Sequence, residues 1–121
     1  NGGVVEGQPV TVRGDPRLLR RLIRNLLDNA NRHGRPPVRV EVRAEGGAAE
    51  LEVIDAGAGV PAEEREQVFA PFRQLGGDAK GAGLGLSLVR QIARLHGGDA
   101  VVAARPDAAS CFRVTLPAKS P

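Results

Sequence analysis

Two asparagines, spaced four residues apart, interrupt a helical pattern in the first third of the chain. The run from Leu18 to His33 places apolar side chains on one half of a helix and arginines on the other, which predicts an amphipathic helix packed on a core. Asn25 and Asn29 depart from this division, and their side chains lie on successive turns, within reach of one ligand. An unpaired buried amide costs about 1–3 kcal/mol, so we expect a polar partner, either loop backbone or a bound ligand.

A carboxylate and two glycines follow an apolar strand-like run in the middle of the chain. Asp55 could form a turn, as aspartate often does, or it could accept a hydrogen bond from the exocyclic amine of a bound ring. Gly57 and Gly59 allow backbone conformations closed to other residues and would let a flat ring approach the main chain. The segment therefore predicts either a tight loop or one wall of a ligand site.

Three alternating glycines open a second predicted helix. Gly81, Gly83 and Gly85 could relax a tight turn, or they could expose N–H groups where the helix dipole attracts phosphate. No Gly-Lys-Ser/Thr follows them, which excludes a Walker loop. No strand leads directly into them, which excludes a Rossmann turn.

Composition excludes several classes of protein. The 121 residues suffice for one domain with a core, and no stretch approaches the roughly 20 apolar residues of a membrane span. A single cysteine, Cys111, excludes an internal disulfide framework and lies in an alternating run where a buried thiol is expected. With three aromatic residues, all Phe, and a net charge of +3, we expect no nucleic-acid partner. The start at Asn1, without Met or a signal peptide, predicts a piece of a longer protein.

Alternation and turn residues predict the remaining elements. The first long helix begins after Asp15 and Pro16 and ends at Gly34. The other expected helices are a short one at 61–68 and a long one from 83 to a stop at 97–98, after a mobile loop at 73–82. The expected strands are 4–5, 10–13, 38–43, 49–54, 100–104 and 111–116, with turns at 46–47 and 106–107. This order favours an α+β fold with helices on one face of a mixed sheet.

Taken together, these motifs resemble the catalytic, ATP-binding domain of sensor histidine kinases, in the superfamily shared with gyrase and MutL. The matching segments are NLLDNANRH (25–33) for the N box, DAGAGVP (55–61) for the G1 box, FAPF (69–72) for the F box and GAGLGLSLVRQIARLHGG (81–98) for the G2 box. The resemblance runs from about 10 to 116. It implies the Bergerat fold, a two-layer α/β sandwich with a mixed, mostly antiparallel sheet of about five strands and three helices on one face.

The resemblance also implies a site for ATP and Mg²⁺. Asn29 would ligate the metal. Asn25 stands where gyrase-like relatives carry a glutamate that activates water; since an amide cannot act as a base, transfer is favoured over simple hydrolysis. Asn25, Asn29 and Arg32 form the implied catalytic set. The implied nucleotide-binding residues are Asn25, Asn29, Arg32, His33, Asp55, Gly57, Gly59, Val60, Phe72, Lys80, Gly81, Ala82, Gly83, Leu84, Gly85 and Leu86.

Several of these roles have simpler alternatives. Arg32 would touch phosphate or be a solvated arginine at a helix end, and His33 would lie beside the nucleotide or on the surface. Lys80 would reach the γ-phosphate or be solvated. Phe69 and Phe72 would pin the base of the loop at 73–82. Asp55 would accept the adenine amino hydrogen, which favours ATP over GTP.

Neither histidine, His33 or His96, lies in the helical context of the family's phosphoacceptor. The resemblance therefore implies one catalytic domain over 1–121 that transfers the γ-phosphoryl group of ATP to a histidine on a separate dimerising segment, from which it passes to an aspartate of a response regulator. It implies a monomeric cytoplasmic domain within a homodimeric, membrane-anchored parent. Two alternatives remain open: a Ser/Thr kinase of the anti-sigma-factor type on the same scaffold, and a non-catalytic nucleotide-binding module.

Overall fold

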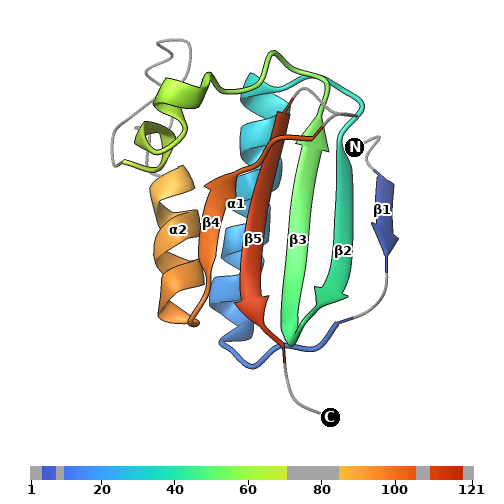
Figure 1. Cartoon of the computed structure of the whole chain (residues 1–121), viewed down its shortest axis with the longest axis vertical. Helices are drawn as coiled ribbons and strands as arrows, with labels where there is room; N and C mark the ends of the chain where they lie inside the picture. Colours follow the sequence, from blue (N-terminus) through green and yellow to red (C-terminus); the bar gives the residue numbers. More distant parts are fainter. Residues whose placement is uncertain (1–3, 8–9, 71–84, 106–109, 119–121) are drawn as a thin grey trace.

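The computed structural model describes residues 4–7, 10–70, 85–105 and 110–118. This part of the chain forms two layers, a five-stranded sheet and a layer of helices against one of its faces (Figure 1). The strands, in sequence order, are β1 (Val4–Gly7), β2 (Arg39–Glu45), β3 (Ala48–Asp55), β4 (Asp99–Val102) and β5 (Ser110–Pro117). Their spatial order is β1-β2-β3-β5-β4, with β1 parallel to β2 and every other pair antiparallel. The predicted fold class is confirmed.

The long helix α1 (Pro16–His33) begins and ends as its sequence predicts. The Asp15 carboxylate accepts hydrogen bonds from the backbone N–H groups of Arg17 and Leu18, at 2.9 and 3.5 Å, and Pro16 occupies the first turn. Leu22, Leu26 and Ala30 are buried against the sheet and the second helix. The arginine side of the helix remains exposed.

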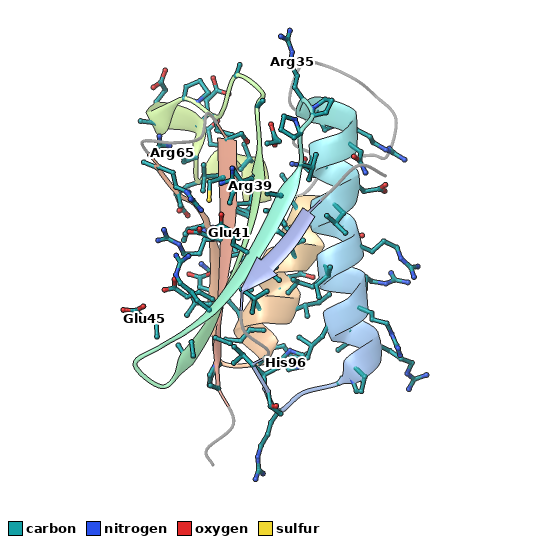
Figure 2. All side chains as sticks on the ribbon, turned by 90° about the vertical axis from the view of Figure 1, so that its right-hand side faces the viewer. Arg35, Arg39, Glu41, Glu45, Arg65 and His96 are labelled. Carbon is teal, nitrogen blue, oxygen red and sulfur yellow. The ribbon has the colours of Figure 1, made fainter. Side chains whose placement is uncertain are left out.

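The second helix, α2 (Gly85–Leu95), packs beside α1 and over β4. The residue after α2, His96, joins this end of the helix to the N-cap of α1, because its Nε2 accepts a hydrogen bond from the Asp15 N–H at 3.1 Å. The other ring nitrogen, Nδ1, lies 2.8 Å from the carbonyl oxygen of Ile92. Figure 2 shows His96 at this end of the helical layer.

Two predicted elements differ from the structure. The expected strand at 10–13 is wrong, because only Val12 forms a bridge, an isolated one with Ala118. The expected short helix at 61–68 is two 3₁₀ turns, η1 (Ala62–Glu64) and η2 (Gln67–Phe69). Only Val68 and Phe69 of these turns are buried, too few apolar contacts to hold a longer α-helix. The predicted loop at 73–82 and turn at 106–107 lie outside the described residues.

Charged side chains cover the face of the sheet that the helices leave open. Figure 2 shows Arg39 and Glu41 on this side, away from α1. At its centre Glu52, with a side chain only 1% exposed, lies 2.7 Å from Arg113, 2.8 Å from Arg105 and 3.2 Å from Arg43. Burial opposes ionisation of Glu52, but the hydrogen bonds from Arg113 and Arg43 outweigh it and lower its pKa.

Cys111 lies beside this charged network and is buried, as the alternating pattern predicts. Burial, with the nearby Glu52 charge, raises the pKa of its thiol to about 12. The thiol is therefore protonated at neutral pH and unsuited to nucleophilic chemistry.

No helix in the described ranges is both long enough and apolar enough to cross a membrane.

Candidate functional site

A cavity of about 240 Å³ lies where the C-terminal end of α1 meets the loop that follows β3. It combines polar side chains with loop backbone. Its described lining residues are Asn29, His33, Gly34, Asp55, Gly57, Ala58, Gly59, Val60, Pro61, Glu64, Ser110 and Phe112. Six of the predicted site residues are thus brought together from two distant segments: Asn29, His33, Asp55, Gly57, Gly59 and Val60.

The Asp55 carboxylate is buried in the cavity wall and only partly satisfied by the protein. The residue is 3% exposed. Its Oδ1 accepts hydrogen bonds from the backbone N–H groups of Gly57, at 2.6 Å, and Arg35, at 3.3 Å. Among the described residues no group donates to Oδ2. The local backbone therefore fixes one carboxylate oxygen and leaves the other to accept a hydrogen bond from a ligand.

Glycines make room for this carboxylate. A Cβ atom at Gly34 would overlap the carboxylate group, and one at Gly57 would lie 2.7 Å from Asp55 Oδ1. Gly59 has a φ of +81°, which disfavours side chains. Gly57 and Gly59 were predicted to serve a close backbone approach. Gly34 was predicted only as a helix stop, because nothing in a single sequence shows that the end of α1 abuts Asp55.

The two asparagines of α1 differ in their surroundings, although both are half-buried. Asn25 Nδ2 donates a hydrogen bond to the backbone carbonyl of Gly85 at 3.3 Å, so it joins α1 to the first residue of α2. Asn29 lines the cavity, and within the described part of the chain its amide has no hydrogen-bond partner. Backbone therefore supplies the expected polar partner for Asn25, while Asn29 retains an amide for a ligand.

Other predicted residues lie away from this cavity. Arg32 is half exposed and lies 3.9 Å from Asp28 one turn earlier on α1, so its contact with phosphate stays a prediction. Gly85 begins α2, and the Leu86 side chain belongs to the core, which leaves only its backbone for a ligand. The remaining predicted contacts lie outside the described residues: Phe72, Lys80, Gly81, Ala82, Gly83 and Leu84.

Sequence reasoning missed the residues that the β5 strand contributes. Ser110 is 8% exposed, pairs directly with Asp55 across the β3–β5 ladder and lines the cavity. Phe112, two residues on, faces the same side and forms part of the wall. The alternation of β5 was visible in the sequence, but the register that sets Ser110 opposite Asp55 joins segments 55 residues apart and leaves no local signal.

The described residues that line the cavity do not form a complete set of protein ligands for a metal ion. The described residues contain no group of three or more His, Cys, Asp and Glu side chains placed to hold one. The Asn29 amide oxygen is nevertheless a suitable single ligand for Mg²⁺, which commonly keeps several waters and takes its other ligands from bound phosphates.

Comparison with known proteins places this architecture among nucleotide-binding domains. Residues 14–120 match the family described as histidine kinase-, DNA gyrase B- and HSP90-like ATPase. The histidine protein kinase DivJ of Caulobacter vibrioides is 39% identical over 120 residues, which cover 95% of this chain and 20% of DivJ. This chain therefore spans about a fifth of the length of that relative.

Solved structures agree with the sequence comparison. The mycobacterial sensor histidine kinase MprB superposes with a TM-score of 0.81 at 36% identity, covering 98% of this chain and 83% of that one. Full-length ShkA in complex with AMPPNP superposes with a TM-score of 0.75 at 25% identity, covering 99% of this chain and 26% of ShkA.

Proposed function

Because the chain belongs to the family of histidine kinase-, DNA gyrase B- and HSP90-like ATPases, we propose that it binds Mg²⁺-ATP in the cavity beside Asp55. We propose further that it donates the γ-phosphoryl group to a histidine on a separate domain. One observation carries the assignment: a carboxylate that is 3% exposed keeps one oxygen without a donor among the described residues, in the wall of a cavity.

Recognition of the base rests on Asp55. Its Oδ2 accepts a hydrogen bond from the exocyclic amine of adenine, while Gly57 and Gly59 let the ring approach the backbone. Guanine presents a keto oxygen at that position, which would set two acceptors against each other. The Ser110 hydroxyl, opposite Asp55, supplies a donor or an acceptor to the same ring.

Asn29 holds the metal in this proposal, since it lines the cavity and its amide forms no hydrogen bond with a described residue. Held there, Mg²⁺ would offset charge on the phosphates. Asn25 holds the start of α2 through the Gly85 carbonyl and cannot remove a proton from water. The site is therefore suited to positioning ATP for another nucleophile rather than to activating water.

The acceptor is a histidine of a different domain. A histidine attacks phosphorus through a neutral ring nitrogen. Both ring nitrogens of His96 are engaged, with Asp15 and with Ile92, and His33, the last residue of α1, belongs to the N-box segment rather than to the helical context of the family's phosphoacceptor. The relatives DivJ and MprB are named as histidine kinases, which supports transfer to histidine. Onward transfer to an aspartate of a response regulator is part of the same proposal. We place the domain in the cytoplasm, monomeric by itself, within a dimeric, membrane-anchored sensor.

The test measures binding and transfer separately. Calorimetric titration with Mg²⁺-ATP should show binding that Asn29→Ala weakens about ten-fold through loss of a metal ligand. Asn31→Ala, an exposed asparagine on the same helix, is the matched control and should bind like the wild type. Equal affinities for both variants would refute the role of Asn29.

Transfer is then followed with γ-labelled ATP and a dimerising acceptor domain supplied in trans. Acid-labile label on the acceptor supports phosphohistidine. Acid-stable label would identify a Ser/Thr kinase instead, and bound ATP without transfer would identify a non-catalytic binding module.

A further inference from the structure

Arg90 on α2 contacts two separate parts of the fold through a side chain that is only 12% exposed. Its Nη1 and Nη2 donate hydrogen bonds to the two carboxylate oxygens of Glu66, at 2.7 and 3.2 Å. Its Nε and Nη2 donate to the backbone carbonyl of Ala100 on the edge strand β4, at 3.2 and 2.9 Å. One planar fork thus fixes α2 to the 3₁₀ region and to the edge of the sheet.

The same guanidinium also lies over an aromatic ring. Its central carbon is 4.2 Å from the centroid of Phe69, which is 4% exposed. At this distance, and away from water, a cation attracts the ring face. The hydrogen bonds to Glu66 and Ala100 fix the plane of the guanidinium, so they also fix where the Phe69 ring can lie.

Phe69 connects this contact to the cavity. Its ring packs edge-to-face with Phe112, with centroids 6.2 Å apart and an interplanar angle of 79°. Phe112 lines the cavity that we assign to the base of ATP. Since buried side chains are close-packed, a displaced Phe69 ring forces Phe112 to adjust.

We propose that Arg90 is a positioning residue for the nucleotide: through Phe69 it holds Phe112 in the wall of the cavity that receives the adenine. This proposal rests on the proposed binding of ATP. The described contacts of Arg90 include no residue that lines the cavity, so Arg90 acts on the cavity through the rings of Phe69 and Phe112.

Arg94 provides a matched control on the same helix. It lies one turn after Arg90 and pairs with Asp99 at 3.0 Å, but its side chain is 57% exposed and its described contacts include no ring. Arg90→Met and Arg94→Met therefore remove equal charge from one helix, and only the first removes a cation from Phe69. Arg90→Lys keeps the charge but loses the fork.

The NMR signals of the phenylalanine rings provide a readout that needs no nucleotide. The chain has three phenylalanines, so a sample with ¹³C-labelled Phe gives three ring systems, assigned with Phe69→Leu and Phe112→Leu. Arg90→Met should shift the signals of both Phe69 and Phe112, Arg90→Lys should shift them less, and Arg94→Met should leave both in place. An unmoved Phe112 signal in Arg90→Met would overturn the proposal.

Nucleotide affinity is the second readout, measured by calorimetry well below the melting temperature. Because the base is common to ATP and ADP, Arg90→Met should weaken both by a similar factor, about five- to ten-fold, with part recovered in Arg90→Lys. A loss confined to ATP, or an equal loss in Arg94→Met, would overturn the proposal. If the wild type binds neither nucleotide, the proposed function itself fails, and the ring signals still report whether Arg90 sets Phe112.

Discussion

Two buried carboxylates lie on the same strand, β3, and face opposite sides of the sheet. Glu52 is 1% exposed and is surrounded by the guanidinium groups of Arg43, Arg105 and Arg113. Asp55 is 3% exposed, and the hydrogen bonds it accepts from the described residues come from two backbone N–H groups, both to Oδ1. One acid is satisfied by the protein, while the other retains an open oxygen beside a cavity.

The contrast shows that burial alone does not identify a site. An ionised carboxylate removed from water needs partners, and Glu52 finds all of them within the chain. Asp55 has backbone partners for one oxygen, and we assign the missing partner to the ligand. Three predictions test this division of roles between stability and binding, in order of decreasing effect.

The largest effect is expected from Glu52→Gln, which should lower the free energy of unfolding by about 3 kcal/mol, because it removes the buried carboxylate charge that Arg43, Arg105 and Arg113 share. For a domain of this size, Tm should fall by about 10 °C. Urea and thermal unfolding measure both. Glu45→Gln, on the exposed end of β2, is the matched control and should change little. The assignment of Glu52 to stability and Asp55 to binding is wrong if Glu52→Gln instead weakens ATP binding at low temperature.

Asp55→Asn should have the opposite effect: it should lower the affinity for ATP and leave the stability nearly unchanged. The amide oxygen can still accept from Gly57 and Arg35, but the other position becomes a donor that faces the adenine amine. Loss of one hydrogen bond to a charged acceptor costs about 1.5–3 kcal/mol, or about 10- to 100-fold in ATP affinity. Calorimetric titration gives the affinity, and a melting curve should show little change in stability. A variant that binds ATP normally would remove Asp55 from the site.

The smallest effect is the dependence of stability on pH. The pKa of Glu52 is lowered in the folded state by Arg113 and Arg43, against the opposing effect of burial. The pKa of Glu41 is lowered chiefly by its hydrogen bond from Arg105. A lowered folded-state pKa contributes stability that is complete above the unfolded value, near 4.5, and is lost as the pH falls below it.

Urea unfolding from pH 7 to pH 3 should therefore show a plateau that declines below about 4.5. The decline should be shallower in Glu52→Gln. An identical decline in that variant would show that the arginine network does not bear this part of the stability.

Features that depend on local pattern were predictable from the sequence. The capped helix α1, the β2–β3 hairpin with its two-glycine turn and the closing strands all follow from periodicity and turn residues. The cavity residues of the N-box and G1-box segments followed from the family resemblance, because each box is a contiguous run. The expected strand at 10–13 failed because four alternating residues are too short a pattern to secure a pairing partner.

Features that depend on register were not predictable. Ser110 meets Asp55, and Arg113 meets Glu52, only because β5 pairs with β3 in one alignment. Asn25 and Asn29 looked alike in sequence, and their separate roles depend on where α2 begins. The Arg90 contacts join α2 to Glu66 and Ala100, and no sequence pattern identifies either residue as a partner of Arg90.

The link from His96 to the N-cap of α1 has a mechanical consequence. Asn25 fastens the beginning of α2 to the middle of α1 through Gly85, and His96 fastens the other end of α2 to Asp15. With both of its ends bonded to α1, helix α2 can neither slide along α1 nor rotate about one contact. Helices α1 and α2 should therefore move as one rigid unit when nucleotide binds, and the conformational changes should occur in the cavity wall around Asp55.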